Sequence, residues 1–323
     1  MPISDMKKFA LKVFVFAFCM VLVDLLCGIC FPLLQSHARG GSTRTNYYVS
    51  DECEADILVL GSSRAQHHYV PRILDSMGGM AYNAGNDGMG IVLGFGRYLM
   101  CAEHYVPKIV IHDITAFDYQ KDDNSKYLKF LRPYGDRREI RNIVYQIGEP
   151  FIDVKMLSNM YRNSSRIIPN IRDLFAKENS DNRGYLPLYK KCKNCDKSSL
   201  KKDSSSLVLD TLKLKIFDQF VNETIRRGSK LYFAISPKYF ALAGDFSDSV
   251  ETHKLPSSYA YAEILAKKYN IPLLNNMYLS GISDNPVFFA DQSHLNDDGA
   301  RAYSHVIVQK LQISEDSLVS MPE

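Results

Sequence analysis

The stretch Asp56-Ile-Leu-Val-Leu60-Gly61-Ser62-Ser63-Arg64 decides how this chain folds. Its short apolar run ends at Gly61, which is typical of a strand buried on both faces of a parallel sheet. A helical pattern begins directly after it and continues through Met77. The stretch therefore predicts a buried strand that leads through a glycine into a helix.

The same alternation of strand and helix continues through most of the chain. Four more short apolar runs predict strands at 80–82, 108–111, 231–235 and 271–274. Further helical patterns lie at 89–105, 206–227, 257–269 and about 297–311. Strands that alternate with helices indicate a parallel sheet covered on both faces. We therefore predict an α/β fold over residues 56–312, a flavodoxin-like three-layer α/β/α sandwich with a five-stranded parallel sheet.

Residues 119–205 interrupt this alternation. They are polar, rich in Tyr, Asn, Lys and Arg, and lack a strong period. We expect them to form a partly helical insertion that caps the core. Residues 313–323 are expected to be a short tail.

An apolar segment near the N-terminus predicts a membrane anchor. The 22 residues from Val13 to Leu34 carry one charge, Asp24, and at ~1.5 Å per residue they would span the ~30 Å hydrocarbon core. Three lysines precede the segment, Lys7, Lys8 and Lys12, and they favour a cytoplasmic N-terminus. We expect residues 1–35 to be a cytoplasmic stub and transmembrane helix, with the remaining chain in the periplasm.

Two questions about this region stay open from the sequence. Asp24 is either a tolerated charge in a single-pass anchor or a helix-pairing or functional site. A cleaved signal peptide is the rival to an anchor, because Ser36-His37-Ala38 fits a small-x-small cleavage site. The apolar run is longer than the usual ~7–15 residues, which favours the uncleaved anchor. Residues 36–55 are polar and contain Gly40-Gly41, so we expect a linker there.

Charge and cysteine content exclude some classes of protein. The net charge is +3 and no basic stripe with interleaved aromatics is present, so nucleic acid is not an expected partner. Four cysteines lie outside the anchor: Cys53, Cys101, Cys192 and Cys195. Four cysteines in a large domain do not indicate a disulfide scaffold, but Cys192 and Cys195 can pair in an oxidising compartment. A single C-x-x-C is a weak signal for zinc, so we expect Cys192 and Cys195 to form either a local disulfide or two free thiols. We expect no metal and no cofactor in this protein.

Ser63 is the candidate nucleophile. A strand, a glycine and then a serine that opens a helix expose the hydroxyl at the turn. The helix N-terminus also offers backbone N–H groups to an anion. The alternative is that Ser62 and Ser63 only cap the helix, a role that serine suits well.

The segment Asp291-Gln-Ser-His294 supplies a candidate base and its carboxylate. A serine hydroxyl needs a base, His is the usual one, and a carboxylate fixes the tautomer of the His. Ligands bind beyond the carboxyl ends of the strands in such sheets, and both motifs fall at that edge. We expect the Ser63 Oγ to lie about 2.6–3.5 Å from a His294 ring nitrogen. The alternative is a capped helix start with a surface histidine.

The two motifs together resemble the SGNH hydrolases, also called GDSL esterases. Gly61-Ser62-Ser63 is similar to the first Gly-Asp-Ser block of the family, with Ser62 in place of the Asp. Asp291 and His294 match the last block, Asp-x-x-His. The resemblance covers about residues 55–118 and 206–312. It implies that Ser63 attacks an acyl ester, that His294 takes its proton and that Asp291 orients His294.

The family's other two blocks supply the oxyanion hole. Tyr82-Asn-Ala-Gly85-Asn86-Asp-Gly88 looks like the second block, in which a glycine N–H joins that of the nucleophile, and Gly88 is the best match, with Gly85 second. The third block, Gly-x-Asn-Asp, reads Thr115-Ala-Phe117-Asp118 here, so Phe117 stands where the donor Asn belongs. Loss of one such donor costs about 10²–10³ in rate. Thr115, Asn86 or a group from the insertion are the expected substitutes.

Two functions follow from this resemblance. The first is a serine esterase or O-acyltransferase that acts on acyl esters, in particular O-acetyl esters, of envelope glycans or lipids. The second is a catalytically weak or inactive SGNH-fold binding protein of the cell envelope, which the Phe117 departure favours. Envelope partner proteins are compatible with both.

Other residues rank lower as candidates for function. His67 and His68 either line the site or lie on the surface one turn into the first helix. Six lysines near the C-x-x-C motif either contact an anionic polymer or belong to a solvated loop: Lys190, Lys191, Lys193, Lys197, Lys201 and Lys202.

Overall fold

The computed structural model describes every residue except 1–2, 177–181, 194, 196–207, 240–256 and 320–323. The chain divides into two compact units, one formed by residues 1–47 and 124–178 and the other by residues 48–123 and 179–323. Lys197, Lys201 and Lys202 lie outside the described residues.

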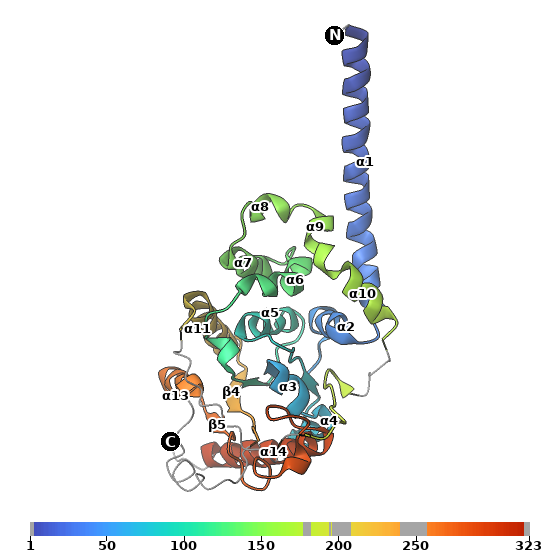
Figure 1. The fold of residues 1–323 in the computed structure, drawn as a ribbon. Coiled ribbons are helices and arrows are strands. Elements are labelled where there is room, and N and C mark those ends of the chain that lie inside the picture. Colours follow the sequence, from blue (N-terminus) through green and yellow to red (C-terminus); the bar gives the residue numbers. More distant parts are fainter. Residues whose placement is uncertain (1–2, 177–181, 194, 196–207, 240–256, 320–323) are drawn as a thin grey trace. The chain divides into compact units, whose positions relative to one another are not determined.

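The second unit is built on a five-stranded parallel sheet (Figure 1). The strands, in spatial order, are β2 (Ala81–Asn83), β1 (Ile57–Gly61), β3 (Ile109–Asp113), β4 (Lys230–Ile235) and β5 (Leu273–Asn275). Each neighbouring pair is parallel, and Gly61 at the end of β1 is in register with Asp113 at the end of β3. This order is that of flavodoxin-like folds, so the predicted fold class is confirmed.

Helices cover both faces of this sheet. One face packs against α5 (Ile91–Ala102) and α11 (Thr211–Arg226), which also contact each other. The opposite face packs against α3 (Ser63–His68), α4 (Pro71–Leu74) and α14 (Asp297–Val319). Alternate side chains of β1 enter the two layers of core because successive residues of a strand point to opposite faces. The last helix extends to Val319, so much of the predicted tail is helical.

Short elements complete the second unit. They are a π-helix η1 (Tyr48–Glu52), the 3₁₀ helices η2 (Asp75–Met77), η3 (Ala116–Asp118) and η8 (Pro286–Phe288), and helix α13 (Ser257–Tyr269). Two disulfides are present in it, Cys53–Cys101 and Cys192–Cys195. The pairing of Cys192 with Cys195 was one of the open alternatives, whereas the pairing of Cys53 with Cys101 was not predicted.

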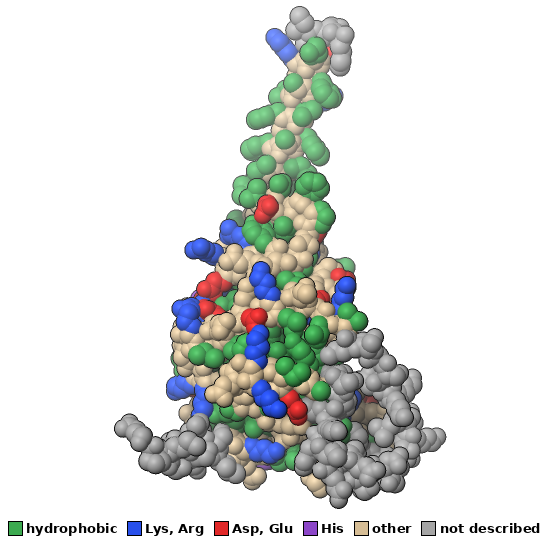
Figure 2. Space-filling model, turned by 90° about the vertical axis from the view of Figure 1, so that its left-hand side faces the viewer, with side chains coloured by type: hydrophobic (Ala, Val, Ile, Leu, Met, Phe, Trp, Pro, Cys, Tyr) green, Lys and Arg blue, Asp and Glu red, His purple; other side chains and the backbone are tan. Residues whose placement is uncertain are grey.

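Among its described residues, the first unit contains helices and the loops between them, and no strand. Its long N-terminal helix is α1 (Ile3–Ser36), and the stretch Asp5–Ser36 is long and apolar enough to cross a membrane. Figure 2 shows hydrophobic side chains along the length of this helix. The other helices are α2 (Gly41–Tyr47), η4 (Asn124–Tyr127), α6 (Leu128–Leu131), η5 (Arg132–Tyr134), α7 (Arg138–Ile147), α8 (Ile152–Lys155), α9 (Asn159–Asn163), η6 (Ser164–Arg166) and α10 (Ile167–Leu174).

The prediction of a linker at 36–55 was wrong. Helix α2 and the π-helix η1 occupy most of this stretch, and Thr43, Asn46 and Val49 are buried. Thr43 donates a hydrogen bond from its hydroxyl to the Asp173 carboxylate at 2.6 Å. The partners of these polar residues lie more than 80 positions away along the chain, so local composition did not reveal them.

Candidate functional site

Ser63 occupies the first position of α3, directly after β1. Gly61 ends β1 with φ +138°, and a Cβ at this position would lie 2.6 Å from the Asp113 carbonyl oxygen. Only glycine accommodates both the conformation and the close approach. Ser62 is the N-cap residue, but its side chain makes no capping hydrogen bond. The alternative in which both serines serve as caps therefore has no support from the hydrogen bonding.

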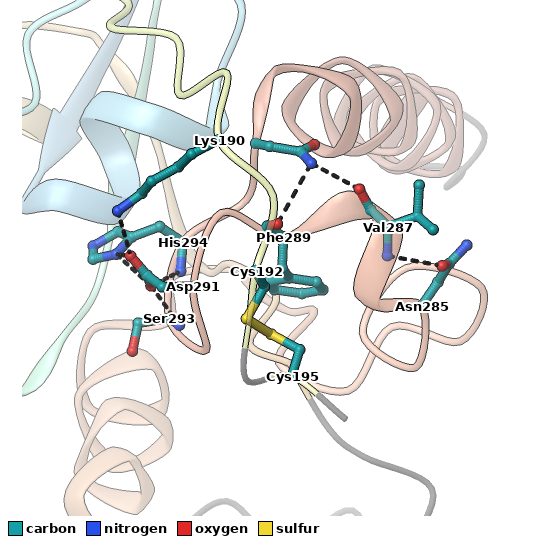
Figure 3. Close-up of a disulfide and its surroundings, with 10 residues drawn as sticks. Lys190, Cys192, Cys195, Asn285, Val287, Phe289, Asp291, Ser293 and His294 are labelled. Carbon is teal, nitrogen blue, oxygen red and sulfur yellow. Dashed lines mark hydrogen bonds and ion pairs between the residues drawn. A yellow bond between two sulfur atoms is a disulfide. The ribbon is translucent and has the colours of Figure 1, made fainter. Parts of the chain in front are cut away.

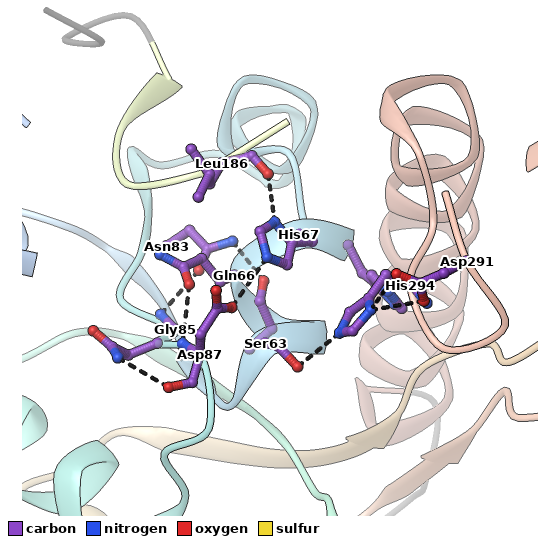
Figure 4. A network of polar contacts seen from close by, with 12 residues as sticks. Ser63, Gln66, His67, Asn83, Gly85, Asp87, Leu186, Asp291 and His294 are labelled. Atoms are coloured by element: carbon purple, nitrogen blue, oxygen red, sulfur yellow. Dashed lines mark hydrogen bonds and ion pairs between the residues drawn. The ribbon is translucent and has the colours of Figure 1, made fainter. Parts of the chain in front are cut away.

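The structure brings together the three residues proposed as a triad. The Ser63 Oγ lies 2.8 Å from Nε2 of His294, and Nδ1 of His294 lies 2.9 Å from Oδ1 of Asp291 (Figure 4). The first distance falls in the range expected for a nucleophile and its base. The arrangement can pass a proton from the serine to Nε2 while the carboxylate holds the Nδ1–H.

The Asp291 carboxylate is held in its ionised form. Partial burial alone would raise its pKa, but hydrogen bonds from the His294 ring and from the amides of Ser293 and His294 hold the pKa well below its ordinary value. Lys190 lies 3.6 Å from the same carboxylate (Figure 3). A carboxylate fixed in this way keeps the His294 ring in one orientation.

His67 and His68 are buried, which excludes the alternative that they lie on the surface. His67 is hydrogen-bonded to the Leu186 carbonyl at 2.6 Å and to the Asp87 carboxylate at 3.0 Å. Nε2 of His68 accepts the Leu295 amide at 3.0 Å, so the proton must sit on Nδ1, which contacts the Ser236 hydroxyl. Burial, followed by the nearby charge of Arg64, lowers the pKa of His68 well below its ordinary value. His68 thereby fixes the backbone beside His294.

A strap formed by residues 182–193 connects the parts of the site. Its Arg183 carbonyl accepts the amide of Asn83, and its Leu186 amide donates to the carbonyl of Gln66 in α3. Further along, the Leu188 carbonyl accepts the Asp297 amide, and the Cys192 amide donates to the Phe289 carbonyl. The disulfide lies at the end of the strap (Figure 3). This is the part of the predicted insertion that borders the site.

Most of the predicted substitute donors for an oxyanion already have acceptors. The backbone amide of Gly85 donates to Oδ1 of Asn83, and the backbone amide of Asn86 donates to the Gly61 carbonyl. The amide and hydroxyl of Thr115 both donate to Oδ2 of Asp118 in a capping box. Gly88 has φ +67°, and an added Cβ would meet open space. The Ser63 amide, in the first turn of α3, has no acceptor within its helix.

Arg97 is a supporting residue of this loop that the sequence did not identify. It is fully buried in α5 and donates to the carbonyls of Ala84 and Gly85 and to Oδ1 of Asn86. The distances are 2.8, 3.2 and 3.1 Å. In the sequence, the signal for this role is that Arg97 is the one charged residue in the otherwise apolar helical stretch 91–102.

The site lies where ligands bind in folds of this class. Chain order takes β2 to one side of β1 and β3 to the other, so β1 and β3 form the switch point of the sheet. Ser63 follows β1, and η3 with Thr115 and Phe117 follows β3. Within the part of the chain that the structure describes, no group of three or more His, Cys, Asp or Glu is placed to hold a metal ion.

Comparison with known proteins gives little guidance. No family model matches the sequence, and no curated protein matches it. Among solved structures, the chain is similar to a protein from Bacteroides fragilis NCTC 9343 described as a "putative acylhydrolase". The identity is 12%, the alignment covers 84% of this chain and 94% of that one, and the TM-score is 0.37. A similarity this low says nothing about the reaction.

Proposed function

We propose that this chain is a serine-dependent esterase or O-acyltransferase of the SGNH type. Its substrates would be acyl esters, in particular O-acetyl esters, of envelope glycans or lipids. The observation that carries the proposal is the continuous hydrogen-bonded chain from Ser63 through His294 to Asp291 at the switch point of the sheet. The residues come from opposite ends of the second unit, yet the distances are those that acyl transfer requires.

The reaction proceeds in two halves. The Ser63 Oγ attacks the ester carbonyl carbon and its proton passes to Nε2 of His294. The tetrahedral intermediate then breaks its bond to the alcohol, which takes that proton from His294 and leaves. In the second half water or an acceptor hydroxyl gives its proton to His294 and attacks the carbonyl carbon of the acyl-enzyme. The bond from that carbon to the Ser63 Oγ then breaks, Ser63 takes the proton back from His294, and an acid or a new ester leaves. Hydrolysis and transfer differ only in this acceptor.

The backbone amides of Ser63 and Gly88 are our candidates for the oxyanion hole. The Ser63 amide belongs to the first turn of α3, where N–H groups lack intrahelical acceptors. Arg97 holds the loop that leads to Gly88 through residues 84–86. Donors held in place before the reaction stabilise charge that appears only in the transition state.

A catalytically weak binding protein is the second candidate function. Phe117 occupies the position of the donor Asn, and the amides or hydroxyl of Gly85, Asn86 and Thr115 already have acceptors. Loss of one donor lowers rate by about 10²–10³. This candidate predicts a folded triad with little or no turnover.

Covalent labelling with a fluorophosphonate separates the two candidates. An activated serine attacks the phosphorus and is phosphonylated, so we expect labelling of the full-length protein at Ser63 and none in Ser63→Ala. Ser62→Ala is the matched control, because Ser62 is adjacent, buried and makes no side-chain cap bond. It should label like the parent. A folded parent protein that resists the probe would favour the binding protein.

Restoring the missing donor should raise turnover. Phe117→Asn places an amide at the position of the family's donor, and we expect turnover of a small acetyl ester to rise by up to about tenfold. Phe117 is 41% exposed, so the loss of packing is smaller than for a buried ring. Phe117→Ala is the control, because it removes the ring without adding a donor. Equal rates for the two variants, with unchanged stability, would show that the added amide does not reach the oxyanion.

We also propose that the second unit lies outside the cytoplasm, with the N-terminus inside. The lysines before the apolar helix favour this orientation. The two disulfides support it, because disulfides persist in oxidising compartments and are rare in the cytosol.

A further inference from the structure

His67 lies one helical turn after Ser63, beside the proposed base. The two residues are four positions apart in α3, which places their side chains on one face of the helix. The His67 ring lies edge-on to the His294 ring, with 5.6 Å between the ring centroids and 85° between the ring planes (Figure 4). His67 is only 4% exposed. The ring is therefore a close neighbour of the candidate triad, but its two nitrogens bind other groups.

Both ring nitrogens of His67 contact hydrogen-bond acceptors. Nδ1 lies 2.6 Å from the Leu186 carbonyl oxygen, and Nε2 lies 3.0 Å from Oδ1 of Asp87. The hydrogen bond from His67 outweighs partial burial and lowers the pKa of Asp87, so this carboxyl is ionised and only accepts. Each nitrogen then carries a proton, and a ring with two N–H groups is a cation. The Asp87 carboxylate balances this charge beside His294.

The contacts of residue 87 fix the backbone directly before Gly88. Besides the His67 ring, the Gln66 side chain binds Asp87, because its Oε1 accepts the Asp87 amide at 3.0 Å. The Asp87 carbonyl accepts the Asn86 side-chain amide at 3.3 Å. Gly88 follows with φ +67°, a conformation that L side chains rarely adopt. Helix α3 therefore supplies both the nucleophile and two side chains that hold the residue before the candidate oxyanion amide.

His67 and Arg97 support different parts of this loop. Arg97 binds the backbone and side chains of residues 84–86, whereas His67 and Gln66 bind residue 87. The Asp87 side chain is 61% exposed, so packing does little to hold it. A pair with an exposed partner also adds little to the stability of a fold. Loss of the His67–Asp87 pair should therefore affect the position of Gly88 more than the stability of the protein.

We propose that His67 is a positioning residue of the candidate oxyanion hole, an inference that rests on the proposed esterase or acyltransferase function. Its Nε2–H holds Asp87 and thereby aims the Gly88 amide at the oxygen that becomes negative in the transition state. A misplaced donor weakens the transition state more than the bound substrate. Loss of the contact to Asp87 therefore lowers kcat and leaves KM nearly unchanged. The contact from Nδ1 to Leu186 holds the strap and is not needed for this role.

Two substitutions of His67 separate the contacts of its two nitrogens. In His67→Asn the side-chain amide nitrogen takes the place of Nδ1 and donates only to Leu186, whereas in His67→Gln it takes the place of Nε2 and donates to Asp87. We expect His67→Asn to lower kcat on p-nitrophenyl acetate by about 10–100-fold, because a misplacement of ~1 Å can cost about 10² in rate. His67→Gln should recover most of this loss. A melting curve checks that each full-length variant is folded.

Hydrogen exchange reads the same contact without any turnover. Mass spectrometry of the peptide that contains residues 84–90 should show faster amide exchange in His67→Asn than in His67→Gln and the parent. Equal kcat and equal exchange in the two variants would overturn the inference. A loss of kcat confined to His67→Gln would also overturn it, because the contact to Leu186 would then be the one that matters.

Ser63→Ala separates this result from a failure of the proposed function. If the parent turns over the ester no faster than Ser63→Ala, the proposed function is wrong and the catalytic role of His67 falls with it. The exchange rates still show in that case whether His67 holds the loop. If the parent is active and both His67 variants match it, only the inference about His67 fails.

Discussion

Replacing Ser63 with alanine is expected to lower the turnover of a small acetyl ester by about 10⁴-fold or more. The hydroxyl is the only group of the site placed 2.8 Å from Nε2 of His294, among the residues that the structure describes. Without it no acyl-enzyme forms, and the remaining acceleration comes only from binding and the oxyanion donors. Steady-state and burst kinetics on p-nitrophenyl acetate measure the loss.

The double variant Ser63→Ala/His294→Ala makes this prediction sharper. Residues that act as one unit lose activity non-additively, so the double variant should be about as slow as either single variant. Ser62→Ala is the matched control and should keep the parent rate. If the two single losses multiply in the double variant, His294 does not serve as the base of Ser63.

Replacing Arg97 with methionine should destabilise the protein by about 3 kcal/mol or more. Arg97 is fully buried and donates to three acceptors in residues 84–86, and an apolar side chain leaves those acceptors unsatisfied. The same loop leads to Gly88, so turnover should fall further than the folded fraction alone explains. Urea denaturation gives the first quantity, and kcat measured on the folded protein gives the second.

Arg97→Lys is the control for this effect. It keeps the charge but cannot present the planar fork that reaches both the carbonyls and the Asn86 side chain. We expect intermediate stability and intermediate kcat, with KM less affected. A methionine variant with the parent's kcat and stability would show that the 84–88 loop holds its conformation without Arg97.

The sheet and the candidate triad could be predicted because their signals are local. Each strand is an apolar run bounded by breakers, and the run 57–60 is buried on both faces as its composition implies. Ser63 directly follows strand β1, and His294 lies just before helix α14. The carboxyl ends of parallel strands lie at one edge of the sheet, so both residues were expected at that edge. The hydrogen bonds from Ser63 to His294 and from His294 to Asp291 are made by these residues alone and include no residue of the insertion.

The supporting residues could not be predicted because their partners are distant. The Asp24 carboxylate accepts hydrogen bonds from Ser158, Asn159 and Met160, which lie 134–136 positions further along the chain. These partners belong to no sequence motif. Cys53 pairs with Cys101 across 48 residues, which spacing alone does not reveal. His68 lies five positions after Ser63, yet its role depends on the Leu295 amide, 227 positions further along the chain. Each of these contacts forms only when the tertiary fold brings the segments together.

The 231 residues that separate Ser63 from His294 have a consequence for biosynthesis. A ribosome that adds about 5–20 residues per second needs roughly 10–50 s to make this interval. During that time the anchor and the nucleophile have already left the ribosome, but the base does not yet exist. On the proposed mechanism, the nascent chain is therefore chemically inert while it is being made, and reactivity begins only when the C-terminal segment folds onto the sheet.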